Sequence, residues 1–166
     1  MILPLTQIPI ASLNEPSRAL TKADLENDEI KELIANMLPT MYQEKGIGLA
    51  APQVGKNIQL CIVGKDCIPE DFELKDPNND LILVNPVYER AGRRAVYETE
   101  GCLSAPGKQG KVKRFKHINV SALDEHGTPI KFEAHGYFAH VIQHETDHLN
   151  STLYIDKAES VWDVED

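Results

Sequence analysis

Two histidines spaced four residues apart carry the strongest chemical signal in the sequence, in the segment His144-Glu145-Thr146-Asp147-His148. On an α-helix, residues i and i+4 project from the same side, so both imidazoles can reach one metal ion at about 2.0–2.1 Å. Glu145 can then take a proton from water that the ion activates. The segment therefore predicts a catalytic metal site, against the alternative of histidines spaced by chance.

A catalytic metal site normally has three protein ligands and one open position, so a third ligand is needed. A metzincin would place Gly at 151 and His at 154, where this chain has Ser151 and Tyr154. A thermolysin-like enzyme needs a downstream glutamate on a second helix, and the segment with Glu159 and Glu165 is too short to form one. The third ligand is therefore expected upstream, where Cys102 lies in the segment Glu100-Gly101-Cys102-Leu103-Ser104. From the residues alone, Cys102 stays a candidate ligand.

The overall composition is that of an ordinary globular protein. The 166 residues, 42% hydrophobic and 26% charged, predict one domain over residues 1–166. A net charge of −9 disfavours binding to DNA or to an anionic membrane. No apolar run approaches the roughly 20 residues that cross a bilayer. Three scattered cysteines and the absence of an export signal at the N-terminus favour the cytoplasm, with Cys61 in the core and Cys67 without a role.

Hydrophobic periodicity predicts two long helices. From Asp28 to Tyr42, apolar residues recur every three or four positions, which is typical of an amphipathic helix. Pro39 lies inside this segment and should kink or shift it. A second helix is expected over residues 136–149, and it is apolar enough to be buried with both histidines facing the interior.

Shorter apolar runs predict strands around these helices. They cover residues 59–63, 81–85, 118–122 and 130–133. His126-Gly127 fits the turn of a hairpin between the last two runs, and residues 65–80 read as a long loop. Residues 157–166 are expected to be a short acidic tail that frays. The fold class is therefore α+β.

Three segments closely resemble the motifs of peptide deformylase, in the same order and with compatible spacing. They are Gly46–Gln53, Glu100–Ser104 and Gln143–His148, and the resemblance spans about residues 28 to 156. It implies a hydrolase that removes the formyl group from the N-terminal methionine of nascent polypeptides. It also implies antiparallel β-sheets around a central helix that carries the His-Glu-x-x-His motif, with the amphipathic helix N-terminal to them.

The resemblance further implies the roles of individual residues. The metal ligands would be Cys102, His144 and His148, holding Fe²⁺ that Zn²⁺, Ni²⁺ or Co²⁺ can replace. Glu145 would act as the general base and then protonate the leaving amine. The Gln53 side chain and the backbone N–H of Leu103 would stabilise the tetrahedral oxyanion.

Formyl is the smallest acyl group, so Gly46, Ile47 and Gly48 can crowd the metal and still admit it. By resemblance, the methionine side chain enters an apolar pocket formed by Ile47, Tyr137, Val141 and His144. The backbone of Ile47–Gly48 and the segment after Ser104 are expected to pair with the peptide as an added strand. The enzyme is expected to be a monomer that meets nascent chains at the ribosome exit.

Several positions depart from the family's pattern, although none belongs to the catalytic set. His140 and Gln109 stand where many relatives carry other residues, and His140 is interpreted as a partly exposed helix histidine. Ser151 replaces the usual glycine after the histidine helix, which makes a left-handed helix end costlier. No long C-terminal helix is predicted. Asp147 and Arg114 are expected to support the site from outside.

Two other classes of protein remain as alternatives. A zinc endopeptidase of the His-Glu-x-x-His type would need a third ligand that the downstream sequence does not supply. A non-catalytic metal-binding protein would be expected to lack Glu145 or Gln53, and both residues are present.

Overall fold

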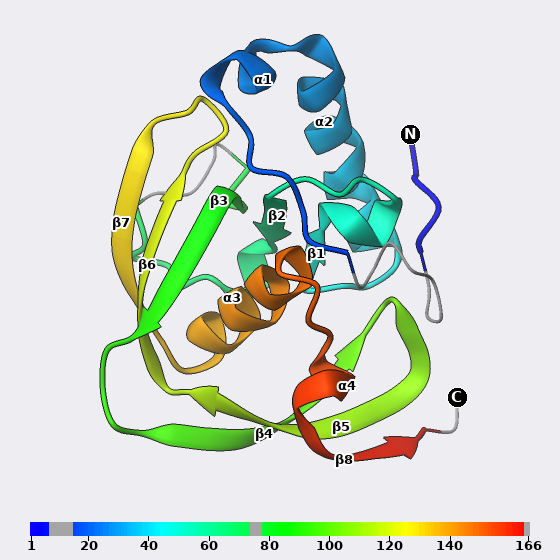
Figure 1. Cartoon of the computed structure of the whole chain (residues 1–166), viewed down its shortest axis with the longest axis vertical. Coiled ribbons are helices and arrows are strands. Elements are labelled where there is room, and N and C mark those ends of the chain that lie inside the picture. Colours follow the sequence, from blue (N-terminus) through cyan, green and yellow to red (C-terminus); the bar gives the residue numbers. More distant parts are fainter. Residues whose placement is uncertain (7–14, 74–77, 165–166) are drawn as a thin grey trace.

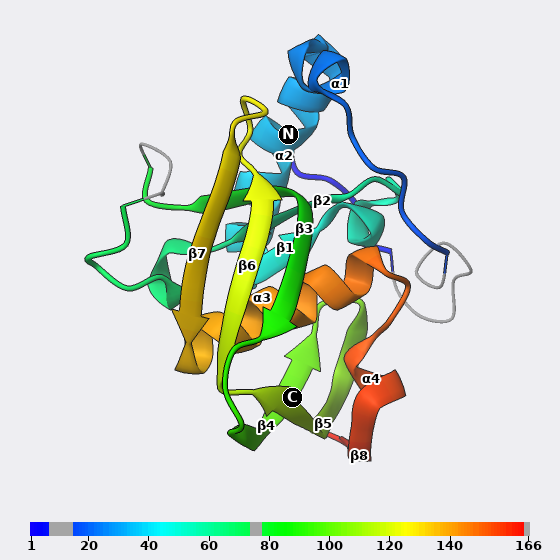
Figure 2. The same ribbon diagram turned by 60° about the vertical axis from the view of Figure 1, so that its left-hand side comes forward.

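Two antiparallel sheets flank helix α3 (Gly136–Leu149) in the computed structural model, which describes residues 1–6, 15–73 and 78–164 (Figure 1). The larger sheet has the strand order β1-β2-β3-β6-β7, and the smaller one has the order β4-β5-β8. Figure 2 shows α3 lying across the larger sheet, with β4, β5 and β8 below it. The strands are β1 (Gly48–Ala50), β2 (Leu60–Val63), β3 (Leu81–Arg90), β4 (Ala95–Cys102), β5 (Ala105–Phe115), β6 (His117–Leu123), β7 (Pro129–His135) and β8 (Ala158–Asp163).

Helix α2 (Asp28–Gln43) covers the opposite face of the larger sheet from α3. The short helix α1 (Lys22–Glu26) precedes it. Asn27 caps α2 by accepting a hydrogen bond from the backbone of Glu29, as expected for an asparagine at a helix start. The helix continues past Pro39 to Gln43, so the proline does not end it. Two 3₁₀ turns, η2 (Ala51–Val54) and η3 (Lys65–Cys67), and a short helix α4 (Tyr154–Lys157) complete the helical elements of the described residues.

The alternating side chains of β2 divide the core between the two helices. Cys61 and Val63 belong to the cluster that includes α3, whereas Leu60 and Ile62 belong to the cluster that includes α2. Because successive side chains of a strand point to opposite faces, a strand covered on both sides must be apolar at every position. This requirement explains the uninterrupted apolar run of β2. Cys61 is a buried core residue, as expected.

The four predicted strands and their hairpin are confirmed; β2 is one residue shorter than predicted, and β3, β6 and β7 are longer. Asp124 fixes the β6–β7 turn by accepting hydrogen bonds from the backbone N–H groups of His126 and Thr128. Gly127 takes the left-handed conformation that such a turn needs, with φ of +84°. No helix in the described part of the chain is long and apolar enough to span a bilayer.

The prediction of a fraying tail is wrong for residues 158–163, which form β8. This strand pairs antiparallel with β5, and Lys108 Nζ lies 2.9 Å from the carboxylate of Asp163. Backbone hydrogen bonds to the open edge of β5 order the segment, and such bonds leave no apolar pattern in the sequence. Residues 165 and 166 of the predicted tail lie outside the described residues.

Ser151 occupies a strained position just after α3. Its φ is +59°, in the left-handed region that costs an L-residue roughly 1–2 kcal/mol because Cβ approaches the following carbonyl. The left-handed helix end, at which serine was expected to be costlier than glycine, is therefore present.

We expect Ser151→Gly to raise the free energy of unfolding by about 0.5–1 kcal/mol, because relief of strain exceeds the extra freedom of glycine in the unfolded chain. Urea denaturation measures the change. Ser160→Gly is a matched control in the exposed strand β8, where glycine should lower stability. A Ser151→Gly protein no more stable than the parent would contradict the inferred strain.

Candidate active site

Cys102, His144 and His148 are brought together from two elements. Each offers one ligand atom, and these atoms lie within 4.8 Å of one another. The two histidines are one turn apart on α3, and Cys102 is the last residue of β4, with its Sγ 3.2 Å from Nε2 of His148. Burial holds the pKa of His148 well below its usual range, which favours the neutral imidazole that binds metals. A thiolate and two imidazoles fit a divalent ion such as Zn²⁺ or Fe²⁺.

The turn between β4 and β5 is fixed by Gln53. The Gln53 amide nitrogen lies 3.3 Å from Cys102 Sγ and 3.2 Å from Ser104 Oγ. The amide oxygen accepts a hydrogen bond from the backbone N–H of Ala50, at 2.9 Å. These contacts orient the amide group so that its N–H donors face the cluster of Cys102, His144 and His148. The side chain can therefore donate to an oxyanion formed beside Cys102.

Glu145, the residue after His144 on α3, has a buried carboxylate. Its Oε1 atom lies 4.0 Å from Nε2 of His144, and its Oε2 atom has no hydrogen-bond partner among the described residues. Burial raises the pKa of Glu145 to about 7, which suits a group that takes up and releases a proton near neutral pH. A Cβ atom at Gly48 would lie 2.8 Å from Oε1, so only glycine allows this strand to pass so close to the carboxylate.

His144 is oriented by a second carboxylate, that of Glu100. The Nδ1 atom of His144 lies 2.6 Å from Glu100, which leaves Nε2 available to an ion. Glu100 also accepts a bidentate pair of hydrogen bonds from Arg114, at 2.6 and 2.8 Å. Burial by itself would raise the pKa of Glu100, but the hydrogen bonds from Arg114, His140 and His144 hold it well below its usual range.

The interpretation of His140 as a partly exposed helix histidine is wrong. It is buried, and its Nε2 atom lies 2.8 Å from Glu100. The helix face that carries it turns toward the charged group of Glu100 rather than toward solvent. Because hydrogen bonding by a distant carboxylate cannot be inferred from helical spacing, the sequence offered no signal for this contact.

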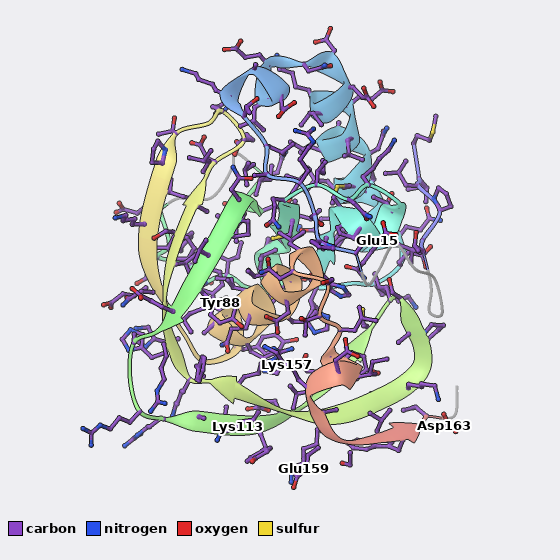
Figure 3. All side chains as sticks on the ribbon, viewed as in Figure 1. Glu15, Tyr88, Lys113, Lys157, Glu159 and Asp163 are labelled. Atoms are coloured by element: carbon purple, nitrogen blue, oxygen red, sulfur yellow. The ribbon has the colours of Figure 1, made fainter. Side chains whose placement is uncertain are left out.

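Asp147 connects Arg114 to two further elements. The remaining guanidinium nitrogen of Arg114, Nη1, lies 2.5 Å from Asp147. Tyr88 of β3 donates to Asp147 at 2.8 Å, and Lys157 of α4 lies 2.8 Å from it. Figure 3 shows Tyr88 and Lys157 coming toward α3 from different elements. Arg114 and Asp147 therefore support the site from outside, and Tyr88, Lys157 and the bridging position of Glu100 were missed by sequence reasoning.

A cavity of about 360 Å³ opens beside these groups. Of the eleven residues predicted for the site, ten line it, and His148 is the exception because it lies deeper. The ten are Gly46, Ile47, Gly48, Gln53, Cys102, Leu103, Tyr137, Val141, His144 and Glu145. Ile47 and Tyr137 are exposed, whereas Val141 is buried, so the apolar wall runs from an exposed rim to a buried floor. Leu103 packs closely on Gly46, where a Cβ would lie 2.7 Å from the Cδ1 atom of Leu103 and would displace that side chain.

The expectation that the peptide pairs with the segment after Ser104 is wrong for most of that segment. Strand β5 has β4 on one side, and from Lys108 to Val112 it has β8 on the other. Gln109 lies opposite Trp162 of β8. A strand paired on both edges has no free backbone groups for an added strand. The edges that line the cavity belong to β1 and β4, the terminal strands of the two sheets.

One cysteine and two histidines that can share an ion, beside a buried carboxylate, are the site of a metal-dependent hydrolase. The family model described as polypeptide deformylase matches residues 2–162. Peptide deformylase 1 of Nostoc sp. is 42% identical over 148 residues, 89% of this chain and 74% of the relative.

Solved structures agree with this relationship. A peptide deformylase from Synechococcus elongatus in complex with actinonin superposes with a TM-score of 0.81 at 40% identity, covering 95% of this chain and 79% of that one. A Met-Ala-Ser-bound class I type b peptide deformylase from Acinetobacter baumannii superposes with a TM-score of 0.82 at 27% identity, covering 95% of this chain and 98% of that one. The chain belongs to the polypeptide deformylase family. It is a metal-dependent hydrolase that removes the formyl group from nascent polypeptides.

We expect Arg114→Met to lower the free energy of unfolding by about 3–5 kcal/mol, because the buried carboxylates of Glu100 and Asp147 would lose the guanidinium group that lies between them. Arg18→Met is the control, since Arg18 makes an exposed ion pair with Asp24 and its loss should cost under about 1 kcal/mol. Urea denaturation of both variants measures the difference. Equal losses would contradict the structural role assigned to Arg114.

Proposed function

We propose that Cys102, His144 and His148 hold the catalytic ion and that Glu145 transfers the proton. The observation that carries this proposal is the meeting of three ligand atoms within 4.8 Å beside a buried carboxylate. In this proposal residues 1–166 act as one catalytic domain, with α3 as its central helix and α2 as its N-terminal amphipathic helix. We further propose a monomer that acts in the cytoplasm, near the ribosome exit.

A divalent ion in this site would supply Lewis acidity, which lowers the pKa of a water molecule and polarises the formyl carbonyl. Glu145 accepts a proton from the attacking water and later delivers it to the leaving amine. Its raised pKa suits both transfers, because the same group must bind the proton and then release it. Gln53 and the backbone N–H of Leu103 donate to the oxyanion of the tetrahedral intermediate.

The peptide lies between the edges of β1 and β4 in this proposal. Its backbone pairs with Ile47–Gly48, and its methionine side chain packs against the apolar wall formed by Ile47, Tyr137 and Val141. Gly46 and Gly48 allow the backbone to approach the reacting carbon closely. An acyl group larger than formyl would clash with Glu145 and with the β1 edge. The site would therefore exclude larger acyl groups.

The resident ion is proposed to be Fe²⁺, with Zn²⁺, Ni²⁺ or Co²⁺ able to replace it. One thiolate and two neutral imidazoles leave a net positive charge on a divalent ion, and this donor set accepts several borderline metals. The ion bound in the cell is then set by supply rather than by the geometry of the site.

We expect Glu145→Gln to lower kcat for formate release from formyl-Met-Ala-Ser by roughly 10²–10⁴-fold, because the amide cannot accept the proton. Metal content should be unchanged, since Glu145 is not a ligand. Glu159→Gln, on the exposed strand β8, is the control and should keep full activity. Casein cleavage measured in parallel separates the alternatives: cleavage without formate release would establish an endopeptidase instead.

We expect the Fe²⁺ form to lose activity in air faster than the Ni²⁺ form, because oxygen oxidises Fe²⁺ and the Cys102 thiolate beside it. The half-life of formate release in air measures this, and anaerobic Fe²⁺ samples are the control. If the two metal forms decay equally fast in air, oxidation of the iron centre is not the cause.

A further inference from the structure

Two histidines and a glutamate meet on the hairpin of β6 and β7, and none of them lines the cavity beside α3. His117 begins β6 and pairs directly with His135 at the end of β7. Glu133 lies two residues before His135, so its side chain points to the same face of the sheet. One ligand atom from each of the three residues lies within 4.8 Å of the others.

The three groups converge without bonding to one another. A carboxylate oxygen of Glu133 lies 3.5 Å from Nε2 of His117 and 3.9 Å from Nε2 of His135. Both separations exceed those of ordinary hydrogen bonds. The Nε2 atom of His117 is buried and has no hydrogen-bond partner among the described residues. The two imidazole rings stack with their centroids 3.9 Å apart, which brings both nitrogens to the same side of the hairpin.

We propose that His117, Glu133 and His135 form a second divalent metal site, separate from the deformylase centre. Two imidazoles and one carboxylate are a ligand set for Zn²⁺ and other borderline ions, with water in the open position. Mg²⁺ and Ca²⁺ are disfavoured because they need mostly oxygen ligands. The Glu133 and His135 side chains are each 64% exposed, so an ion can enter from solvent, whereas the less exposed His117 forms the floor of the site.

The position of this site gives ion binding a structural consequence. His135 is the N-cap residue of α3, and Gly136 follows it with φ of +58°. An ion bound by His117 and His135 would therefore fasten the start of β6 to the start of the helix that carries His144 and His148. Because the ligands converge only in the folded chain, binding should stabilise the protein by mass action.

Titration calorimetry with Zn²⁺ on the Ni²⁺-loaded protein tests the proposal, with nickel content checked before and after. We expect one further Zn²⁺ per chain. His117→Asn and His135→Asn should each weaken its binding by at least about tenfold, since loss of even a supporting partner of a metal ligand costs that much. His126→Asn is the matched control, because His126 lies at the exposed turn of the same hairpin and outside the cluster.

A second readout keeps the test independent of how well the variants fold. In the parent protein, Zn²⁺ at about tenfold above its dissociation constant should raise Tm by roughly 3–6 °C. The imidazole nitrogen resonances of His117 and His135 should shift during the titration, while those of His126 stay in place. The proposal is overturned by the absence of a further Zn²⁺ equivalent, by unshifted His117 and His135 resonances, or by a further equivalent that both histidine variants retain.

Discussion

The guanidinium group of Arg114 lies between two carboxylates from different parts of the chain, Glu100 on β4 and Asp147 on α3. All three side chains are more than nine-tenths buried. The strand that ends at Cys102 and the helix that carries both histidines are thus joined by one cation. Glu100 also contacts His140 and His144 of α3 directly, so Arg114 adds a second polar connection between the strand and the helix. Glu100 and Arg114 together therefore set how β4 and α3 meet.

The charges of this network also balance. Glu100 and Asp147 supply two negative charges, and Arg114 and Lys157 supply two positive ones. A network with no net charge would place little bias on an ion held beside it, and Cys102 would then supply most of the compensating charge. Hydrogen bonds fill the remaining positions of both carboxylates, which is the condition under which buried ion pairs are tolerated. Glu145 has no cation bonded to it, and its pKa can rise to the range that proton transfer requires.

The parts of this arrangement that sequence reasoning could reach are those with a local signal. Helical spacing of His144 and His148, and the motif resemblance that added Cys102, identified the residues that the fold brings together. The apolar runs of β2 and β6 likewise located strands covered by helices. Strands β4, β5 and β8 were not predicted, because exposed, charged strands leave no alternating apolar pattern. The Glu100–Arg114–Asp147 contacts could not be predicted as a set, since they depend on how β4, β5 and α3 meet.

Strand β8 shows how an element without a sequence signal can still shape the site. It occupies the edge of β5 from Lys108 to Val112, and the helix before it sends Lys157 to Asp147. The strand edges at the cavity are those of β1 and β4. Lys157 at the same time joins the end of the chain to the charge network behind the histidines. The pairing of β5 and the charge network around Asp147 therefore both depend on the segment from Tyr154 to Asp163.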